Sequence, residues 1–383
     1  MEWKELQTLV KRKIGYGIVQ PGPSVPKGVP IIKVNNIISG LYDTKHLDKT
    51  TVENDAKYQR TKLKGGELIV TVVGTCGKTA IVPTHFAGCN LVRATCLIDI
   101  EDETICRWIK YYIDSPQGQA YINQNLNTTV QATLNVKNLN EMPIPFYSKE
   151  YTSNVVKILS SLDRKIELNN KINADLEEMA QAIFKNWFVD FEPFKDGKFV
   201  DSELGMIPEG WKVGLLGELC NFKRGKNLLT KNAIDEGVPV VAGGLEPSCY
   251  HNEANTGAPV ITVSGSGANA GFMRMYHVPV WASDCSFIDI SCENFYFVYC
   301  FLNVNSKLLK HAQTGAVQPH VKPSDIHDFE LVIPNKESIF DFQNKVKPFF
   351  DRIATIQKES SRLSLLRDTL LPRLMSGEIE IPE

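Results

Sequence analysis

Y-T-S-N-V-V-K-I-L-S-S-L-D-R-K-I-E-L-N-N-K-I-N-A-D-L-E-E-M-A-Q-A-I-F-K-N-W-F, residues 151–188, decides the fold of this chain. It contains neither glycine nor proline, and one seam position recurs every seven residues, at Val155, Leu162, Asn169, Leu176 and Ile183. Heptads sustained over this length predict one long helix that packs along a partner helix. At about 1.5 Å per residue, some 36 residues would span roughly 54 Å. The polar Asn169 is expected to fix the register of the pair.

The partner helix is found in the same chain. Between residues 339 and 374 apolar side chains again recur every seven positions, each 187 residues after its counterpart: Phe342, Phe349, Ile356, Leu363 and Leu370. Proline is tolerated in a first helical turn and is costly deeper, so we expect this helix to begin near Pro348 and to end or kink at Pro372. The alternative is two amphipathic core helices of a single domain, although core helices seldom run ten turns.

The regions outside the two helices repeat one another. Both contain short β-branched runs between Gly, Pro and Asn residues, which predict strands. Five segments match in order: 3–4 with 211–212, 28–30 with 237–239, 68–77 with 259–267, 130–131 with 317–318, and 142–145 with 331–334. A duplication of this period predicts an α+β protein of two similar β-rich domains separated by two long helices. We place the first domain at 1–150, the central spacer helix and linker at 151–199, the second domain at 200–335 and the C-terminal spacer helix at 336–383.

Composition narrows the class of protein. The 383 residues carry a net charge of -2 and nine cysteines, with no C-x-x-C pair and no metal-like spacing to the seven histidines. Scattered cysteines without a signal peptide predict reduced thiols in the cytoplasm. Because no apolar run approaches transmembrane length, no membrane partner is expected.

The best enzymatic candidate is V-V-G-T-C-G-K-T, residues 72–79, which follows a strand-like run and resembles a phosphate-binding loop. A true P-loop has its first glycine five residues before the Gly-Lys pair, where Val72 stands here. The second copy of the motif, around Ser264 and Ser266, has no lysine. A tight turn at the end of a strand explains both copies, and no other catalytic motif is found. The chain is therefore predicted not to be an enzyme and to need no cofactor, with a nucleotide hydrolase as a less favoured alternative.

Recognition of DNA is the remaining function. Residues 1–150 hold 18 basic against 14 acidic side chains, whereas residues 200–335 hold 9 against 14, so DNA binding would need local basic faces. Candidate phosphate contacts are Lys11, Arg12, Lys13, Lys33, Arg60, Lys62, Lys78, Lys223, Arg224, Lys226 and Arg274. Candidate contacts to base edges, which amide and guanidinium groups suit, are Asn35, Asn36, Asn90, Gln131, Asn227, Asn269, Gln318 and His320. Thr75, Ser264 and Ser266 are further candidates for DNA binding.

Several motifs resemble one known family. A-I-F-K-N-W-F-V-D-F-E-P-F (182–194), followed by G-M-I-P-E-G-W-K (205–212), is similar to the central region of specificity subunits of type I restriction–modification systems. L-L-P-R-L-M-S-G-E-I (370–379) resembles their C-terminal region, and residues 28–37, 73–79 and 314–321 resemble pieces of their target-recognition domains. The resemblance covers the whole chain in order.

That resemblance implies more than the residues alone. Two target-recognition domains would each read one half of a bipartite sequence in double-stranded DNA, and the helices would form an antiparallel coiled coil with approximate twofold symmetry. Two methyltransferase subunits and a restriction–translocase subunit would dock on this frame and bring S-adenosylmethionine, ATP and magnesium with them. Phe184, Trp187, Phe188 and Phe191 are carried over as candidates for partner docking or for seating the domains on the coil. The alternative outside the family is a coiled-coil adaptor that binds protein.

Overall fold

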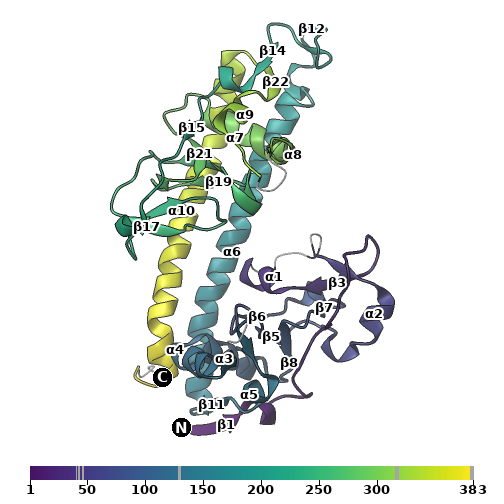
Figure 1. Ribbon diagram of the computed structural model, residues 1–383, viewed down its shortest axis with the longest axis vertical. Helices are drawn as coiled ribbons and strands as arrows, with labels where there is room; N and C mark the ends of the chain where they lie inside the picture. The colour runs from purple at the N-terminus through teal and green to yellow at the C-terminus, as the bar shows by residue number, and fades with distance from the viewer. Residues whose placement is uncertain (40, 42–43, 45–46, 128–130, 315–318, 380–383) are drawn as a thin grey trace. The chain divides into compact units, whose positions relative to one another are not determined.

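The computed structural model describes the chain except for residues 40, 42–43, 45–46, 128–130, 315–318 and 380–383 (Figure 1). Two compact units divide it: Met1–Glu167 together with Ser360–Glu383, called unit 1 here, and Leu168–Glu359, called unit 2. Each long helix contributes one part to each unit. The predicted α+β class, with two similar domains and two long helices, is confirmed.

The long helices are α6 (Lys149–Phe188) and α10 (Lys336–Met375), each of 40 residues. The prediction that α10 begins near Pro348 is wrong, because the helix starts twelve residues earlier and continues through both prolines. Ile339, Phe342 and Val346 are all buried in that earlier part. Three such side chains stabilise by roughly 1.5–3 kcal/mol each, which outweighs the cost of about 3 kcal/mol for an interior proline.

The body of unit 1 is a four-stranded antiparallel sheet of order β2-β8-β5-β6, beside a three-stranded sheet of order β4-β3-β7. Helix α3 packs on the four-stranded sheet through Trp108, which is fully buried and donates its indole N–H to the Pro145 carbonyl at 2.7 Å. The elements of this unit before α6 are β1 (Glu2–Glu5), β2 (Gly15–Tyr16), β3 (Val29–Ile32), α1 (Val34–Ser39), β4 (Lys49–Thr50), α2 (Val52–Ala56), β5 (Leu68–Thr71), β6 (Thr79–Ile81), β7 (Asn90–Leu91), β8 (Thr95–Ile98), α3 (Glu103–Asp114), α4 (Pro116–Gln124), β9 (Leu126–Asn127), β10 (Thr133–Leu134), α5 (Val136–Asn140) and β11 (Pro143–Phe146).

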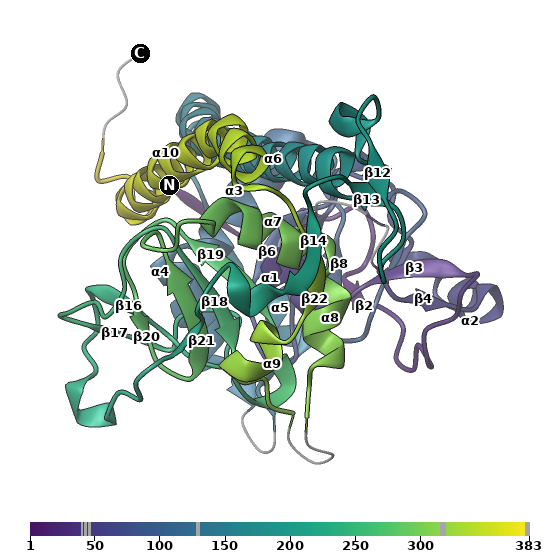
Figure 2. The same ribbon diagram turned by 90° about the horizontal axis from the view of Figure 1, so that it is seen from above.

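Unit 2 repeats this topology. Its antiparallel sheet has the order β15-β21-β18-β19 and its smaller sheet the order β17-β16-β20, and in both units the smaller sheet contains one parallel pair. Helix α7 lies between the larger sheet and the α6–α10 pair (Figure 2). The elements are β12 (Phe199–Val200), β13 (Ile207–Pro208), β14 (Lys212–Leu215), β15 (Lys223–Arg224), β16 (Val238–Val241), β17 (Cys249–His251), β18 (Val260–Ser264), β19 (Met273–Tyr276), β20 (Trp281–Ala282), β21 (Cys285–Asp289), α7 (Phe295–Val304), α8 (Ser306–His311), α9 (Pro323–His327) and β22 (Glu330–Ile333).

The helices run antiparallel within each unit. In unit 1, Tyr151 near the start of α6 donates to the Leu374 carbonyl near the end of α10, and Asp163 pairs with Arg367. In unit 2, Asn169 donates to Glu359 at 2.9 Å. Of the predicted seam, Val155, Asn169, Phe342 and Ile356 are buried, and Leu162, Leu176, Ile183, Phe349, Leu363 and Leu370 are half-buried. The seam also uses a second column that the heptad count missed: Val346, Phe350 and Ile353.

The tail motif of α10 has a structural role in unit 1. Tyr147 donates to the Met375 carbonyl at 3.2 Å, and Tyr151 donates to the Leu374 carbonyl at 2.8 Å. The helix ends at Met375 and is followed by Gly377, whose φ of +75° suits glycine and where a Cβ would lie 2.8 Å from the Tyr147 ring. The chain segment 371–379 is therefore built to hold α10 against the start of α6.

Candidate nucleic-acid interface

The turn between β5 and β6, residues 71–79, contains the run that resembles a P-loop. Its backbone groups are already bonded within the protein: Gly77 N–H donates to the Thr71 carbonyl, and Lys78 N–H donates to the Thr71 hydroxyl at 2.9 Å. Val72, at the place of the first P-loop glycine, is buried and donates its N–H to the Ala94 carbonyl. These amides cannot cradle a phosphate as those of a P-loop do. The segment is a rigid turn at a strand end.

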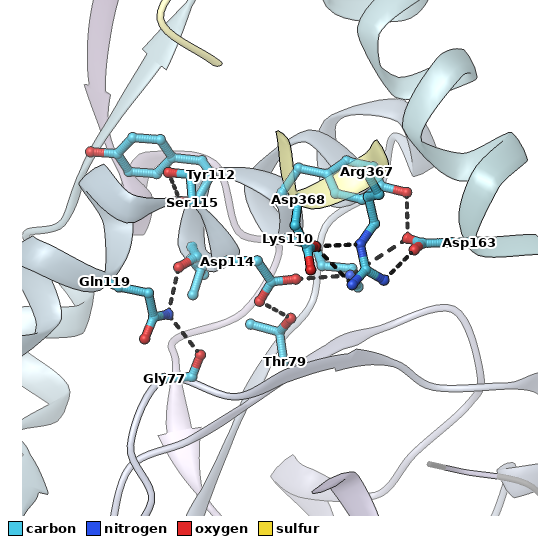
Figure 3. Close-up of polar contacts among 12 residues, drawn as sticks. Gly77, Thr79, Lys110, Tyr112, Asp114, Ser115, Gln119, Asp163, Arg367 and Asp368 are labelled. Carbon is cyan, nitrogen blue, oxygen red and sulfur yellow. Dashed lines mark hydrogen bonds and ion pairs between the residues drawn. The ribbon is translucent and has the colours of Figure 1, made fainter. Parts of the chain in front are cut away.

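Three neighbouring segments support this turn from outside. Gln119 of α4 donates through Nε2 to the Gly77 carbonyl at 3.0 Å and to the Ile113 carbonyl at 2.7 Å (Figure 3). Thr79 donates to the carboxylate of Asp114 at the end of α3, at 2.6 Å. On the other side, Gly74 N–H donates to the Ala132 carbonyl at 2.8 Å. The turn is thus fixed by side chains and backbone far from it in sequence.

Unit 2 builds the same frame between β18 and β19. Gly271 N–H donates to the Ser264 carbonyl as Gly77 does to Thr71, and Gly267 N–H donates to the Pro319 carbonyl as Gly74 does to Ala132. Gln313 Nε2 donates to the Ala270 carbonyl at 2.8 Å, in the manner of Gln119. We name the two structures turn 1 (residues 71–79) and turn 2 (residues 264–273). Their agreement in hydrogen bonds extends the duplication from topology to local geometry.

Glycine is required at corresponding corners of the two turns. Gly77 and Gly271 have φ of +82° and +78°. A Cβ on Gly271 would lie 2.6 Å from the Leu309 carbonyl oxygen, and one on Gly77 would lie 3.0 Å from Ile122. The left-handed conformation and the crowding both exclude larger residues. The structure therefore pairs Gly77 with Gly271, and Leu68 with Ile261 in the preceding strands. The sequence match of 68–77 with 259–267, which pairs Gly77 with Gly267, is wrong in its register.

The residues that the turns expose are different. Turn 1 presents Thr75 and Lys78, and turn 2 presents Ala268 and Phe272. Gln131 is also exposed and stands over turn 1, with its amide nitrogen 3.0 Å from where a Cβ of Gly74 would lie. A shared frame with different exposed side chains is the arrangement expected where two loops recognise different partners.

Turn 1 is connected to the helices of unit 1 through a chain of polar contacts (Figure 3). Asp114, which holds Thr79, also accepts from Lys110 at 2.9 Å, and Lys110 lies 3.8 Å from Asp163. Asp163 accepts from Tyr111 at 2.8 Å and from Arg367 at 2.9 Å. Burial alone would lower the pKa of Lys110, but Asp114 and Asp163 raise it above its ordinary value. The amine is therefore charged, and the contacts form an ionic chain.

The corresponding places in unit 2 are apolar. The strands before α3 and α7 share Ile-Asp-Ile at 98–100 and 288–290, and this match places Cys300 where unit 1 has Lys110. By the 187-residue repeat of the helices, the position of Asp163 in unit 1 corresponds to Phe350 in unit 2, and that of Arg367 corresponds to Ala180. Cys300, Phe350 and Ala180 are all buried in the core of unit 2. The two units therefore fix their turns by different chemistry, ionic in unit 1 and apolar in unit 2.

Many of the predicted basic residues are paired with carboxylates. Arg12 pairs with Asp99 and Glu67, Lys62 with Asp55, and Arg224 with Asp284, which also accepts from Ser266. Further partners are Glu101 for Lys11, Asp48 for Lys33 and Glu246 for Arg274. The Lys33 ammonium holds the pKa of Asp48 below its usual range. Exposed candidates are Lys11, Lys13, Lys33, Asn35, Arg60, Thr75, Lys78, Gln131, Lys223, Arg224, Lys226 and Asn227, and Arg12, Asn36, Lys62, Ser266, Asn269, Arg274 and His320 are half-buried.

Two of the predicted DNA contacts lie inside the protein. Asn90 is fully buried. Its side-chain amide accepts a hydrogen bond from the Thr61 hydroxyl at 2.7 Å and donates one to the Asp55 carboxylate at 2.8 Å, so Asn90 belongs to the core under the smaller sheet. Ser264 is also buried, within β18. Both predictions of DNA contact are therefore wrong, because the strands place these side chains inward. Gln318 lies outside the described residues.

Two of the predicted docking aromatics are core residues as well. Phe184 and Phe188 are 2% and 7% exposed and pack against Phe297 and Phe342 in unit 2. A side chain so buried cannot contact a partner subunit without unfolding its surroundings, so partner docking is ruled out for these two residues. Their contacts with α7 and α10 support the other alternative, that they seat the domain on the helix pair. Trp187 and Phe191 are half-buried, and Phe191 packs edge-on against Trp211.

Metal binding and membrane insertion find no support in the described part of the chain. No group of three His, Cys, Asp or Glu side chains there is arranged to hold a metal ion. No helix among the same residues is long and apolar enough to cross a membrane.

Known proteins are similar to this chain in sequence and fold. The type I restriction modification DNA specificity domain matches twice, over residues 22–178 and 208–362. The specificity subunit of the type I restriction enzyme MjaIX of Methanocaldococcus jannaschii is 30% identical over 307 residues, covering 74% of this chain and 71% of that protein. The EcoBI specificity subunit of Escherichia coli is 31% identical over 197 residues, 49% of this chain and 41% of that one. A crystal structure of a type I system S subunit from M. genitalium superposes with a TM-score of 0.52 at 18% identity, covering 97% of this chain and 95% of that one.

The relatives are named specificity subunits, the non-catalytic components of type I systems, so the prediction that this chain is not itself an enzyme is confirmed. The two family matches together span most of the chain and fall on the two repeats. The protein belongs to the family of type I restriction–modification specificity subunits, whose role is DNA sequence specificity.

Proposed function

We propose that this chain reads a bipartite target in double-stranded DNA, with unit 1 on one half-site and unit 2 on the other. The observation that supports this proposal is the duplicated turn frame with different exposed residues, Thr75 and Lys78 on turn 1 and Ala268 and Phe272 on turn 2. Side chains of unlike chemistry select unlike bases. A target with two different halves follows from one chain that carries two such turns.

The exposed basic and amide residues supply the remaining contacts in this proposal. Lysine and arginine side chains would position each unit on phosphates, and the amides of Gln131 and Asn227 would reach base edges. Phosphate contacts release counterions, so binding is expected to weaken steeply with salt. A protein-binding adaptor would lack that dependence on duplex DNA and salt.

The partners belong to the same proposal. Two methyltransferase subunits and a restriction–translocase subunit would dock on the chain, and the half-buried Trp187 and Phe191 are the aromatic candidates for contact. The cofactors of the reactions would be bound by those partners. The domain division at 1–150, 151–199, 200–335 and 336–383 is proposed as the functional one, with the two long helices as spacers.

Selection from random duplexes tests the function. The full chain, assembled with type I methyltransferase subunits, would be incubated with a pool of random DNA at two salt concentrations, and the retained sequences read. We expect two specific blocks of bases separated by an unspecific gap of fixed length. One continuous block, or retention that does not depend on sequence, would contradict the proposal.

A further inference from the structure

Lys78 and Phe272 occupy the same place on the two turns. In unit 1, Thr71 N–H donates to the Lys78 carbonyl at 2.9 Å, and in unit 2 Ser264 N–H donates to the Phe272 carbonyl at 2.9 Å. Each residue directly follows the glycine of left-handed conformation, Gly77 or Gly271, and directly precedes the returning strand. The backbone of this position is therefore fixed in the same way in both units.

The side chain at this position has no comparable constraint. Lys78 is exposed, and Phe272 is 39% exposed. Thr75 and Ala268, in the middle of the two turns, are exposed too. The frame thus holds one variable side chain outward in each unit at a defined place.

We infer that the position occupied by Lys78 and Phe272 determines base preference at one base pair of each half-site. This inference rests on the proposed function. An ammonium donates to the N7 and O6 acceptors of guanine, whereas an aromatic ring makes apolar contact with the methyl group of thymine. Lys78 selects guanine in the half-site of unit 1, and Phe272 selects thymine in the half-site of unit 2.

Gln119 and Gln313 act as positioning residues for these two side chains. Each amide donates to the backbone carbonyl at or just before the glycine that precedes the specificity position, at 3.0 Å to Gly77 and at 2.8 Å to Ala270. Gln119 lies in α4, and Gln313 lies two residues after the end of α8. They fix where Lys78 and Phe272 stand without contacting DNA themselves.

Substitution of the two positions tests the inference in the full chain assembled with methyltransferase subunits. Lys78→Ala is expected to lower the preference for guanine at one position of one half-site by about 5- to 150-fold, the equivalent of one base contact of about 1–3 kcal/mol, and to leave the other half-site unchanged. Phe272→Ala should act only on the other half-site, and replacing its thymine by uracil, which lacks the methyl group, should reproduce that loss with the unsubstituted protein. Lys64→Ala and Val278→Ala, exposed residues of the same two units, serve as matched controls.

Two results would overturn the inference. If Lys78→Ala weakens binding equally for all sequences and reduces the salt slope by about one, Lys78 contacts only phosphate. If neither substitution changes either half-site, the position does not face DNA. In both cases the unsubstituted protein would still select a bipartite target. If the proposed function itself were wrong, the unsubstituted protein would not select a bipartite target, so the two failures can be told apart.

Discussion

Replacing Asp163 by asparagine should weaken unit 1 and leave unit 2 intact. Asp163 is 16% exposed and accepts from Arg367 and Tyr111, with Lys110 at 3.8 Å. Breaking a buried ion pair costs about 3–5 kcal/mol and breaking an exposed one about 0–1 kcal/mol. With Arg367 at 30% and Lys110 at 20% exposure, we expect about 2–3 kcal/mol.

Hydrogen exchange of the full chain measures this loss separately in each unit. A loss of 2–3 kcal/mol corresponds to amide exchange about 30- to 150-fold faster, and we expect it in α3 and in the first half of α6. Peptides from α7 and β18 should exchange as before, because unit 2 has apolar residues at the matching places.

Asp368→Asn is the matched control for this experiment. Asp368 binds the same guanidinium of Arg367 but is 60% exposed, so its loss should cost about 0.5 kcal/mol or less. Equal effects of the two substitutions, or faster exchange in both units, would refute the view that the ionic chain holds unit 1 alone.

Three further outcomes are expected. Gln119→Leu should reduce selectivity at the half-site of unit 1 and Gln313→Leu at that of unit 2, as seen in duplex selection, and identical effects on both half-sites would contradict separate frames. Insertion of one heptad into each long helix should lengthen the unspecific gap and leave both specific blocks unchanged, and altered blocks in the selected sequences would count against the helices as spacers. Burial raises the pKa of Cys96 and Cys285 to about 12, so only about one in 10,000 of these thiols is ionised at pH 8. Alkylation followed by mass spectrometry should leave both unmodified until the protein unfolds, whereas rapid labelling would show that the sheets are open.

Much of the fold could be predicted because it follows from periodicity and duplication. The heptads of residues 151–188 predict α6, and the repeat at 187 residues predicts α10. The prediction placed the start of α10 near Pro348, twelve residues too late. It used the rule that proline is costly inside a helix, and that rule takes no account of the stability gained by burying Ile339 and Phe342. In the second seam column only Phe350 has a charged counterpart in the 187-residue repeat, Asp163, whereas Val346 and Ile353 match the apolar Leu159 and Ile166. The column was missed because the heptad count followed a single position of α10.

The site was predictable only in part. Both glycine motifs were recognised as turns, and Lys78 was recognised as a candidate. Gln119 and Gln313 were not found, because their role depends on contacts 42 and 43 residues away in sequence, and an isolated glutamine gives no local signal. Burial rules out DNA contact for Asn90 and partner contact for Phe184. The sequence could not show this, because an amide suits both a base edge and a buried hydrogen-bond network, and an aromatic side chain on a helix suits both a core and an interface.

Photo-crosslinking tests the central claim most directly. Benzoylphenylalanine would be placed at Thr75 or at Ala268, which are exposed in the middle of turns 1 and 2. It would be activated in the assembled complex on its selected duplex, and the crosslinked bases would be mapped. The two probes should mark two separate blocks of the target, one for each unit. Crosslinks from both probes to the same block, or from neither to DNA, would show that the turns do not each read a half-site.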